Sequence, residues 1–278
     1  MKNPMKLFED KVEFGFSDNS DGNLAFRFGD IDDVNQKRRI FFKKEGIDPE
    51  TSVVMLPEHA SNAVEVTKRD SGKGVYKLDD AIRCDCIYTR DKNLNLLVTV
   101  ADCIALAIYD SANEQLAMAH IGVKNLSIGT VGEVLRVLKE NSDNEADFSA
   151  ITGPFIKKCC YGFDKIPEYL KNLENYFIPS SCHPERQPKD PLKIRERDSS
   201  ARRATKSARL PDGQVGMTEC YYFDTESVLR DQLVEAGVKK ENISTSGLCS
   251  MHNDFPSYRR SLKENLPESR MLVYARMI

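Results

Sequence analysis

The sequence predicts an α+β fold with mixed connectivity. Short apolar segments separated by polar turns, a pattern typical of strands, predominate before residue 120, whereas apolar residues recur at helical spacing from Leu126 to Leu138. The 278 residues are 40% hydrophobic and 30% charged, as in a globular protein rather than a disordered one. No internal repeat is evident, and we expect one domain over residues 1–278.

Strands are expected over most of the chain before residue 100. Aromatic residues alternate between Phe14 and Phe28 on either side of a turn cluster, and a mixed apolar and basic stretch ending at Gly46 predicts a helix from Asn35. Further strands are predicted at residues 52–56, 63–66, 82–89 and 94–100, the last two paired with each other through a short polar turn.

A β-hairpin is predicted over residues 103–120, where two apolar runs flank a polar turn. If residues 111 and 112 form the loop, Cys103 sits directly across from His120, and a four-residue loop at 110–113 gives the same pairing. Directly opposed residues have Cβ atoms about 4.5–5.5 Å apart, which suits two ligands of one zinc ion. A slip of one residue would send the two side chains to opposite faces.

Helices become more frequent after the hairpin. One helix is expected to begin near Asn125 or Ser127 and to end before Asn141. Others are expected at residues 166–177 and 223–236, and strands at 150–152, 243–246 and 270–275. The stretch 182–216 stands apart, because it has four prolines, many basic residues and almost no large apolar ones. It predicts an exposed polar and basic excursion, which is either a solvated loop or a lid or anion-binding arm over an active site.

Composition restricts the expected partners and location. The net charge of −3 gives no reason to expect nucleic acid or an anionic membrane surface as a partner. No stretch approaches the roughly 18 apolar residues of a membrane span, and the first ten residues lack the apolar segment of a secretory signal. We therefore expect a cytoplasmic protein, monomeric or weakly dimeric, whose eight cysteines are thiols rather than a disulfide framework.

Cys103 and His120 are candidate ligands of a catalytic metal. Zinc in proteins favours Cys thiolate and His nitrogen, and a catalytic site keeps one coordination position open for water, whose pKa falls to about 7. Hairpin register supports the Cys103–His120 pair, whereas His59 lies far upstream and only the fold can bring it to them.

Motif-like segments occur in order along most of the chain. Residues 99–104 (TVADCI) are similar to T-A-D-C-x-P, residues 120–125 (HIGVKN) to H-A-G-W-R-G, residues 153–161 (GPFIKKCCY) to G-P-x-I-x-x-C-C-Y, and residues 85–89 (DCIYT) to D-A-L-V-T. Cys249 with residues 257–260 (SYRR) is similar to C-T…S-Y-R-R, and His59 matches the histidine of Q-x-H-G. In this order the chain resembles the laccase-domain family, which was called multicopper polyphenol oxidase and is now regarded as purine nucleoside phosphorylase.

The resemblance implies His59, Cys103 and His120 as zinc ligands, in a layered α/β/β/α fold related to toxin-type cysteine hydrolases. It implies phosphorolysis of adenosine, inosine and methylthioadenosine to a free base and a ribose 1-phosphate, with zinc-dependent deamination of adenosine. The partners implied are purine nucleosides and phosphate. Within H-A-G-W-R-G, the tryptophan is replaced by Val123 and the arginine by Lys124, so the chain is a divergent member.

Phosphorolysis needs a cationic clamp on phosphate. Arg259 and Arg260 are the natural candidates, because a guanidinium binds phosphate through two parallel hydrogen bonds, and Lys124 supplies charge without that geometry. Deamination needs a proton donor, for which Asp102 is the candidate next to Cys103. Neighbouring strand residues point to opposite faces, so the alternative for Asp102 is that it orients the structure around the site.

Two other functions stay open at this stage. Cys103 could be a nucleophile with His120 as its base, as in a thiol hydrolase or deamidase. Alternatively, the chain could be a catalytically weakened relative whose fold serves binding. Copper-dependent phenol oxidation is disfavoured, because one cysteine and two histidines cannot supply a multicopper cluster.

Overall fold

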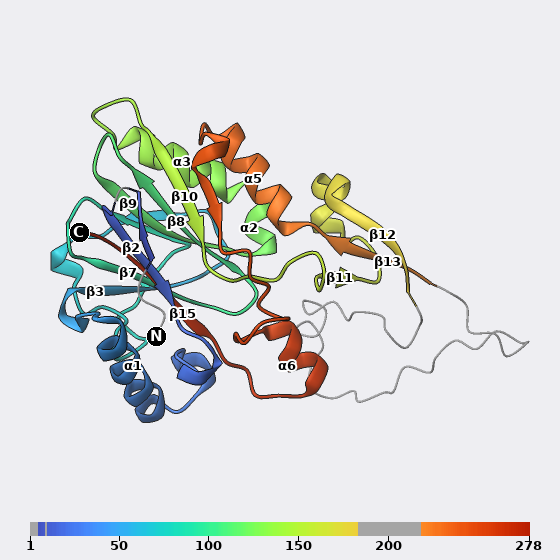
Figure 1. Cartoon of the computed structure of the whole chain (residues 1–278), viewed down its shortest axis with the longest axis horizontal. Coiled ribbons are helices and arrows are strands. Elements are labelled where there is room, and N and C mark those ends of the chain that lie inside the picture. The colour runs from blue at the N-terminus through green and yellow to red at the C-terminus, as the bar shows by residue number, and fades with distance from the viewer. Residues whose placement is uncertain (1–4, 9, 183–217) are drawn as a thin grey trace, which may run out of the picture. The chain divides into compact units, whose positions relative to one another are not determined.

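The computed structural model describes residues 5–8, 10–182 and 218–278 (Figure 1). Most of the excursion expected at 182–216 lies outside the described residues. The chain divides into two compact units, Lys157–Val228 and a larger one formed by Met1–Ile156 with Leu229–Ile278.

Two six-stranded sheets build the larger unit. The first has the order β1 (Met5–Leu7), β2 (Val12–Phe16), β15 (Met271–Met277), β7 (Asn95–Val100), β3 (Ser52–Leu56) and β5 (Ile82–Arg83). The second has the order β14 (Ile243–Thr245), β10 (Phe148–Thr152), β8 (Ile104–Asp110), β9 (Gln115–Ile121), β6 (Cys86–Thr89) and β4 (Ala63–Glu65). Each sheet contains both parallel and antiparallel neighbours, as the α+β prediction with mixed connectivity required.

The sheets are the inner layers of an α/β/β/α arrangement (Figure 1). Buried residues from both sheets, among them Val98 of β7 and Met118 of β9, form one core cluster between them. A second core cluster joins Phe41 and Phe42 of α1 (Ile31–Glu45) to the other face of the first sheet. Helix α3 (Thr130–Glu140) contacts β9 on the outer side of the second sheet. The layered fold expected from the resemblance is confirmed.

Capping residues set the helix bounds. Helix α1 begins earlier than the predicted Asn35, because the Asp30 carboxylate accepts hydrogen bonds from the amides of Asp32 and Asp33, and it ends at Gly46 with φ 65°. The helix predicted to begin near Asn125 or Ser127 and end before Asn141 is two helices, α2 (Val123–Ser127) and α3, separated at Gly129 with φ 74°. Within residues 5–8, 10–182 and 218–278 the other α-helices are α5 (Thr225–Glu235) and α6 (Tyr258–Glu264). Short 3-10 helices lie at Asn19–Asp21, Phe26–Phe28, Pro49–Thr51, Lys68–Asp70 and Lys240–Asn242.

The predicted hairpin is present, but its register differs by two residues. Ala105 rather than Cys103 lies across from His120, because Asp110 pairs with Gln115 and the loop is residues 111–114. Since the displacement is even, Cys103 and His120 keep the same face of the sheet. Cys103 lies just before β8 rather than within it.

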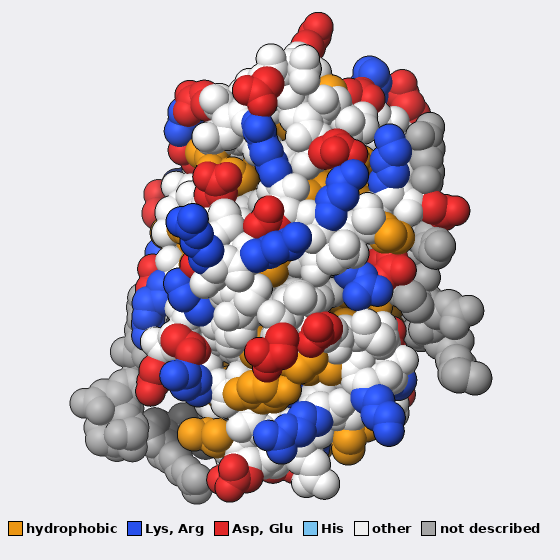
Figure 2. Space-filling view, turned by 90° about the vertical axis from the view of Figure 1, so that its left-hand side faces the viewer, with side chains coloured by type: hydrophobic (Ala, Val, Ile, Leu, Met, Phe, Trp, Pro, Cys, Tyr) orange, Lys and Arg blue, Asp and Glu red, His pale blue; other side chains and the backbone are white. Residues whose placement is uncertain are grey.

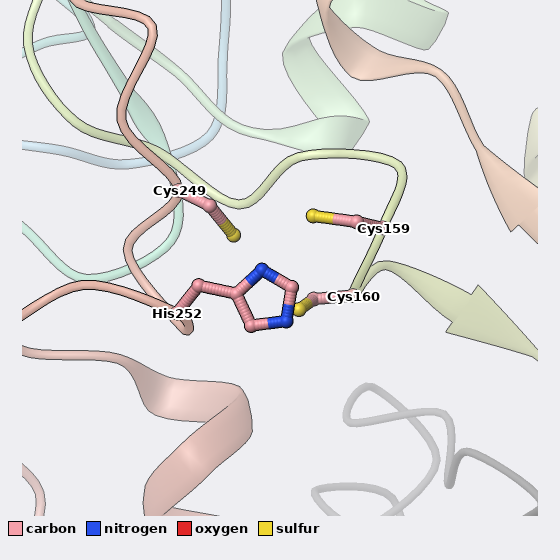
Figure 3. A group of neighbouring side chains, drawn as sticks. All are labelled: Cys159, Cys160, Cys249 and His252. Atoms are coloured by element: carbon pink, nitrogen blue, oxygen red, sulfur yellow. The ribbon is translucent and has the colours of Figure 1, made fainter.

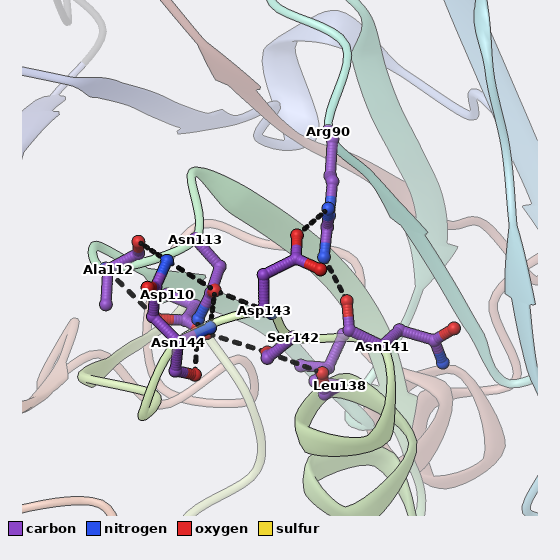
Figure 4. Close-up of polar contacts among 9 residues, drawn as sticks. All are labelled: Arg90, Asp110, Ala112, Asn113, Leu138, Asn141, Ser142, Asp143 and Asn144. Carbon is purple, nitrogen blue, oxygen red and sulfur yellow. Dashed lines mark hydrogen bonds and ion pairs between the residues drawn. The ribbon is translucent and has the colours of Figure 1, made fainter.

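A polar network explains this register (Figure 4). The buried Asp110 carboxylate accepts hydrogen bonds from the Ala112 amide (3.1 Å), Asn113 Nδ2 (2.7 Å) and Ser142 Oγ (3.2 Å). Asp110 is therefore fixed as the last paired residue, and the turn begins only after it. In the same region the Arg90 guanidinium donates a hydrogen bond to the Asp143 carboxylate at 2.7 Å.

A second pairing prediction is wrong. The strands expected at 82–89 and 94–100 do not pair, because β6 joins β9 in the second sheet, whereas β7 joins β3 and β15 in the first. The polar turn at residues 90–93 therefore connects two sheets and not two neighbouring strands.

The smaller unit contains a three-stranded sheet, ordered β11 (Gly162–Phe163), β13 (Thr218–Phe223) and β12 (Phe177–Cys182). The helix predicted at 166–177 is a 3-10 helix, Glu168–Tyr176, with non-helical backbone at Leu173. Aromatic rings form its core: Phe163, Phe177 and Phe223 have centroids 4.7–6.4 Å apart.

The state of the cysteines agrees only in part with the expectation from the sequence. Among the described residues six cysteines are thiols, whereas Cys220 is disulfide-bonded, so the expectation of thiols is wrong at Cys220. Acidic and basic side chains are interspersed on the face in Figure 2. Among the described helices, none combines the length and apolar character needed to cross a membrane.

Gly15 of β2 provides the first prediction. It lies opposite Tyr274, and a Cβ at Gly15 would stand 2.5 Å from Cε1 of that buried ring. We expect Gly15→Ala to lower the free energy of unfolding by about 1–3 kcal/mol, because the ring has to move from its packed position. Urea denaturation of the purified variant measures this loss.

The matched control is Gly132→Ala in α3, where nothing lies within 4 Å of the added Cβ. This change should leave stability unchanged or raise it by about 0.5–1 kcal/mol, since alanine favours helix more than glycine. Equal effects at the two positions would contradict the steric argument.

Candidate functional site

Three connections between the two sheets meet at one place. His59 follows β3 and precedes β4, Asp85 lies between β5 and β6, and Cys103 lies between β7 and β8, so each is on a segment that passes from the first sheet to the second. His120 reaches the same place from the second sheet, near the end of β9. Residues far apart in the chain are therefore neighbours because the sheets are layered.

The three predicted metal ligands converge around Gly122. The rings of His59 and His120 have centroids 4.9 Å apart. A Cβ on Gly122 would stand 3.3 Å from both the Cys103 Sγ and the His59 Nδ1. Gly122 therefore leaves the space into which the thiol and the imidazole point. The charge and hydrogen bonding of Cys103 also act directly on His120.

Asp85 supports both histidines. Its buried carboxylate lies 3.0 Å from His120 Nδ1 and accepts hydrogen bonds from the backbone amides of His59 (3.1 Å) and Ala60 (2.6 Å). Because Nδ1 of His120 faces the carboxylate, Nε2 is the nitrogen left for a ligand. Sequence reasoning assigned no role to Asp85. The available signal was an acidic residue inside the apolar segment 82–89, where a carboxylate needs a partner.

The donor set fits zinc. Ligand atoms of His59, Asp85 and His120 lie within 4.8 Å of one another, whereas the predicted ligand Cys103 is outside this group and its thiol lies next to Gly122. Two imidazoles and one thiol suit a tetrahedral ion with one open position. A carboxylate on the outer nitrogen of one histidine is the usual support of such a ligand.

The pKa values of His120 and His59 shift in opposite directions. Burial lowers the pKa of His120, but the Cys103 charge and the hydrogen bond to Asp85 more than offset it and raise that pKa to about 9. Burial, with the charge of His120, lowers the pKa of His59, so this ring is neutral at pH 7. Neutral imidazole is the form that binds metal ions.

Asp102 points away from this cluster. Its carboxylate accepts hydrogen bonds from Ser250 Oγ (2.6 Å) and the Arg259 amide (2.6 Å), and its carbonyl accepts one from the Ile156 amide (3.0 Å). Its φ of 74° lies in the left-handed region. These contacts favour the orienting role for Asp102: it fixes the bend from which Cys103 enters the site.

The three candidate phosphate-binding cations lie in different surroundings. The Arg260 guanidinium donates to the backbone carbonyls of Ser250 (3.0 Å), Asn253 (2.8 Å) and Phe255 (3.2 Å), so it holds the loop before α6. Arg259 is buried in the first turn of α6, with 6% exposure. Lys124 is exposed on α2, near enough that its charge acts to lower the pKa of His59.

Figure 3 draws four further side chains with thiol or imidazole groups, two from each unit. In the larger unit, Cys249 is buried, its amide donates to Asn253 Oδ1 at 3.0 Å, and His252 lies exposed on the loop that Arg260 holds. In the smaller unit, Cys159 is exposed and Cys160 is partly buried.

Substitution of Asp102 tests its positioning role. Asp102→Gly keeps the left-handed backbone but removes both carboxylate contacts, and we expect it to lower the free energy of unfolding by about 2 kcal/mol. Asp102→Ala should lower it further, because alanine also carries the strain of positive φ. Chemical denaturation of both variants measures the order. A less stable glycine variant would contradict this account.

The raised pKa of His120 predicts a pH dependence in the metal-free protein. His120 is protonated up to about pH 9 when folded but only to about 6.5 when unfolded, so its stabilisation is present below pH 6.5 and is lost between pH 6.5 and 9. Urea unfolding with chelator present, between pH 6 and 9.5, should show this fall. His120→Gln should lack it; an unchanged slope in that variant would refute the assignment.

Known proteins resemble this chain over most of its length. The family model described as multi-copper polyphenol oxidoreductase laccase matches residues 13–274. Purine nucleoside phosphorylase YlmD of Bacillus subtilis (strain 168) is 29% identical over 237 residues, which span 82% of this chain and 72% of that protein.

Two solved structures share the fold. The hypothetical protein YfiH of Bacillus licheniformis superposes with a TM-score of 0.72 at 23% identity, over 97% of this chain and 94% of that one. YlmD of Geobacillus stearothermophilus superposes with a TM-score of 0.71 at 22% identity, over 96% and 91%. Since the family model covers most of the sequence, the chain belongs to the multi-copper polyphenol oxidoreductase laccase family.

Proposed function

We propose that this protein is a zinc-dependent purine nucleoside phosphorylase. Adenosine, inosine or methylthioadenosine would react with phosphate to give the free base and a ribose 1-phosphate, with deamination of adenosine as a side activity. The observation that carries the proposal is the convergence of two imidazoles and one thiol beside a buried carboxylate. The name of the Bacillus subtilis relative supports the choice of reaction.

His59, Cys103 and His120 would hold the zinc ion, which when bound supplies Lewis-acid activation of an oxygen atom at the open position. The chain's own residues have distinct tasks. Asp85 fixes the ring of His120 through Nδ1 and the His59 loop through two amides. The same donor set disfavours a copper oxidase, because it cannot supply a multicopper cluster.

Phosphate binding would use the cation beside the metal ligands. Lys124 is exposed and acts electrostatically on His59, so it can meet an anion that approaches this face of the site. Arg259 in α6 is the second candidate. Arg260 would act indirectly, because its guanidinium already holds the carbonyls of the preceding loop. A cytoplasmic location and a monomeric or weakly dimeric state stay predictions.

One observation favours a second function. Cys103, His120 and Asp85 also form the order of nucleophile, base and orienting carboxylate that thiol hydrolases use. His59 separates the two proposals. The hydrolase arrangement is complete without it, whereas the metal site requires it.

Metal analysis with a phosphorolysis assay tests the proposal. Purified protein should hold one zinc ion per chain and release hypoxanthine from inosine only when phosphate is present. His59→Ala should lose both the zinc and the activity, because the site then has only two protein ligands. Glu58→Ala is the control: this exposed neighbour forms an ion pair with Arg83 and should keep both.

The outcomes separate the alternatives. Unchanged phosphorolysis by metal-free protein, or by His59→Ala, would overturn the zinc requirement. Protein that takes up no zinc and releases no hypoxanthine would overturn the phosphorylase proposal and leave thiol chemistry at Cys103 as the alternative. Zinc-bound protein that releases no hypoxanthine would instead indicate a weakened relative that binds nucleosides.

A further inference from the structure

The loop that carries His59 is held from two sides by buried polar side chains. On one side Asp85 accepts the amides of His59 and Ala60 at 3.1 and 2.6 Å. On the other side the Ala60 carbonyl accepts hydrogen bonds from Asn125 Nδ2 (2.7 Å) and Thr130 Oγ1 (3.1 Å). The backbone amides of His59 and Ala60 and the Ala60 carbonyl are thereby all hydrogen-bonded to side chains from other elements.

Asn125 connects this loop to the rest of the site. It is fully buried in α2, and its Oδ1 accepts the Gly122 amide at 3.0 Å. A Cβ on Gly122 would stand 3.3 Å from Asn125 Oδ1 and from His59 Nδ1, so the amide group and the imidazole flank the same point.

His59 needs such support because its backbone is strained. Its φ of 58° lies in the left-handed region, which costs a residue other than glycine about 1–2 kcal/mol. The residue also lies at the surface, with its ring only partly covered, so core packing alone does not hold it. Hydrogen bonds to the adjacent peptide groups are therefore the main restraint on where the imidazole points.

We propose that Asn125 is a positioning residue, which sets the place of His59 in the metal site through the Ala60 carbonyl. The inference rests on the proposed function. Asn125 itself contributes no metal ligand. Its Oδ1 caps α2 at Gly122, while its Nδ2 reaches across to the His59 loop, so one amide fixes the relative placement of two ligand-bearing segments.

Two variants separate these contacts. Asn125→Ala removes both, whereas Asn125→Asp keeps an oxygen for the Gly122 amide and loses the Nδ2 donor, with its hydrogen bonds to the Ala60 carbonyl and to Thr130 Oγ1. We expect both to weaken zinc binding by about 10- to 100-fold, as is usual when the support of a ligand is lost. Chelator competition measures the zinc affinity. Ser127→Ala, on the same helix, is the control and should bind zinc as the unaltered protein does.

The same Asn125 variants in a His59→Ala background distinguish positioning from general structure. If Asn125 acts through His59, Asn125→Ala should change the residual zinc affinity less than twofold there. In metal-free protein, amide hydrogen exchange over residues 57–62 should become faster in both Asn125 variants and stay unchanged in Ser127→Ala.

Contrary outcomes are distinct. Unaltered protein that takes up no zinc would overturn the proposed function and this inference with it. If the unaltered protein binds zinc, two results would overturn the inference alone. One is an Asn125→Asp variant that binds zinc as tightly as the unaltered protein. The other is an equal loss of zinc affinity on Asn125→Ala with and without His59.

Discussion

The buried carboxylate of Asp85 is the interaction around which the site is arranged. A charge without solvent contact must be paired, and here the partners are one imidazole nitrogen and two backbone amides. Those partners belong to His59, Ala60 and His120, on segments that share no local sequence. Because the buried Asp85 carboxylate requires these partners, it fixes the positions of both candidate ligands, His59 and His120. Asp85 can serve both because it lies where the chain passes from the first sheet to the second.

Local patterns predicted the elements well and their partners less well. Alternating and helical spacing identified the hairpin strands and α3, because those signals depend on neighbours in sequence. The pairing expected between 82–89 and 94–100 failed, since a polar turn looks the same whether it joins paired strands or two sheets. The predicted hairpin register differs from the observed one by two residues. Asp110 remains in the strand and pairs with Gln115, because its carboxylate is hydrogen-bonded to the turn and to Ser142. The even displacement preserved the face, so the Cys103–His120 neighbourhood survived the error.

Residues that depart from the resembled motifs are explained by contact with one another. Ala60 and Asn125 stand where Q-x-H-G and H-A-G-W-R-G have glycine, and no local pattern relates the two positions. In the fold they meet, with the Asn125 amide on the Ala60 carbonyl and Thr130 beside it. A sequence read segment by segment shows two separate losses of glycine. The structure shows one hydrogen-bonded connection between the segments that carry His59 and His120.

The support given to His59 bears on which chemistry the site performs. Cys103, His120 and Asp85 would complete a thiol–imidazole–carboxylate arrangement without any contribution from His59. Yet the fold holds His59 in a strained backbone conformation by hydrogen bonds from both sides of its loop. Strained residues persist only where the surroundings over-determine them, and such strain is concentrated at functional positions. Under the proposed function this imidazole is the third metal ligand, beside a thiol and a second imidazole, whereas thiol catalysis would leave it without a role.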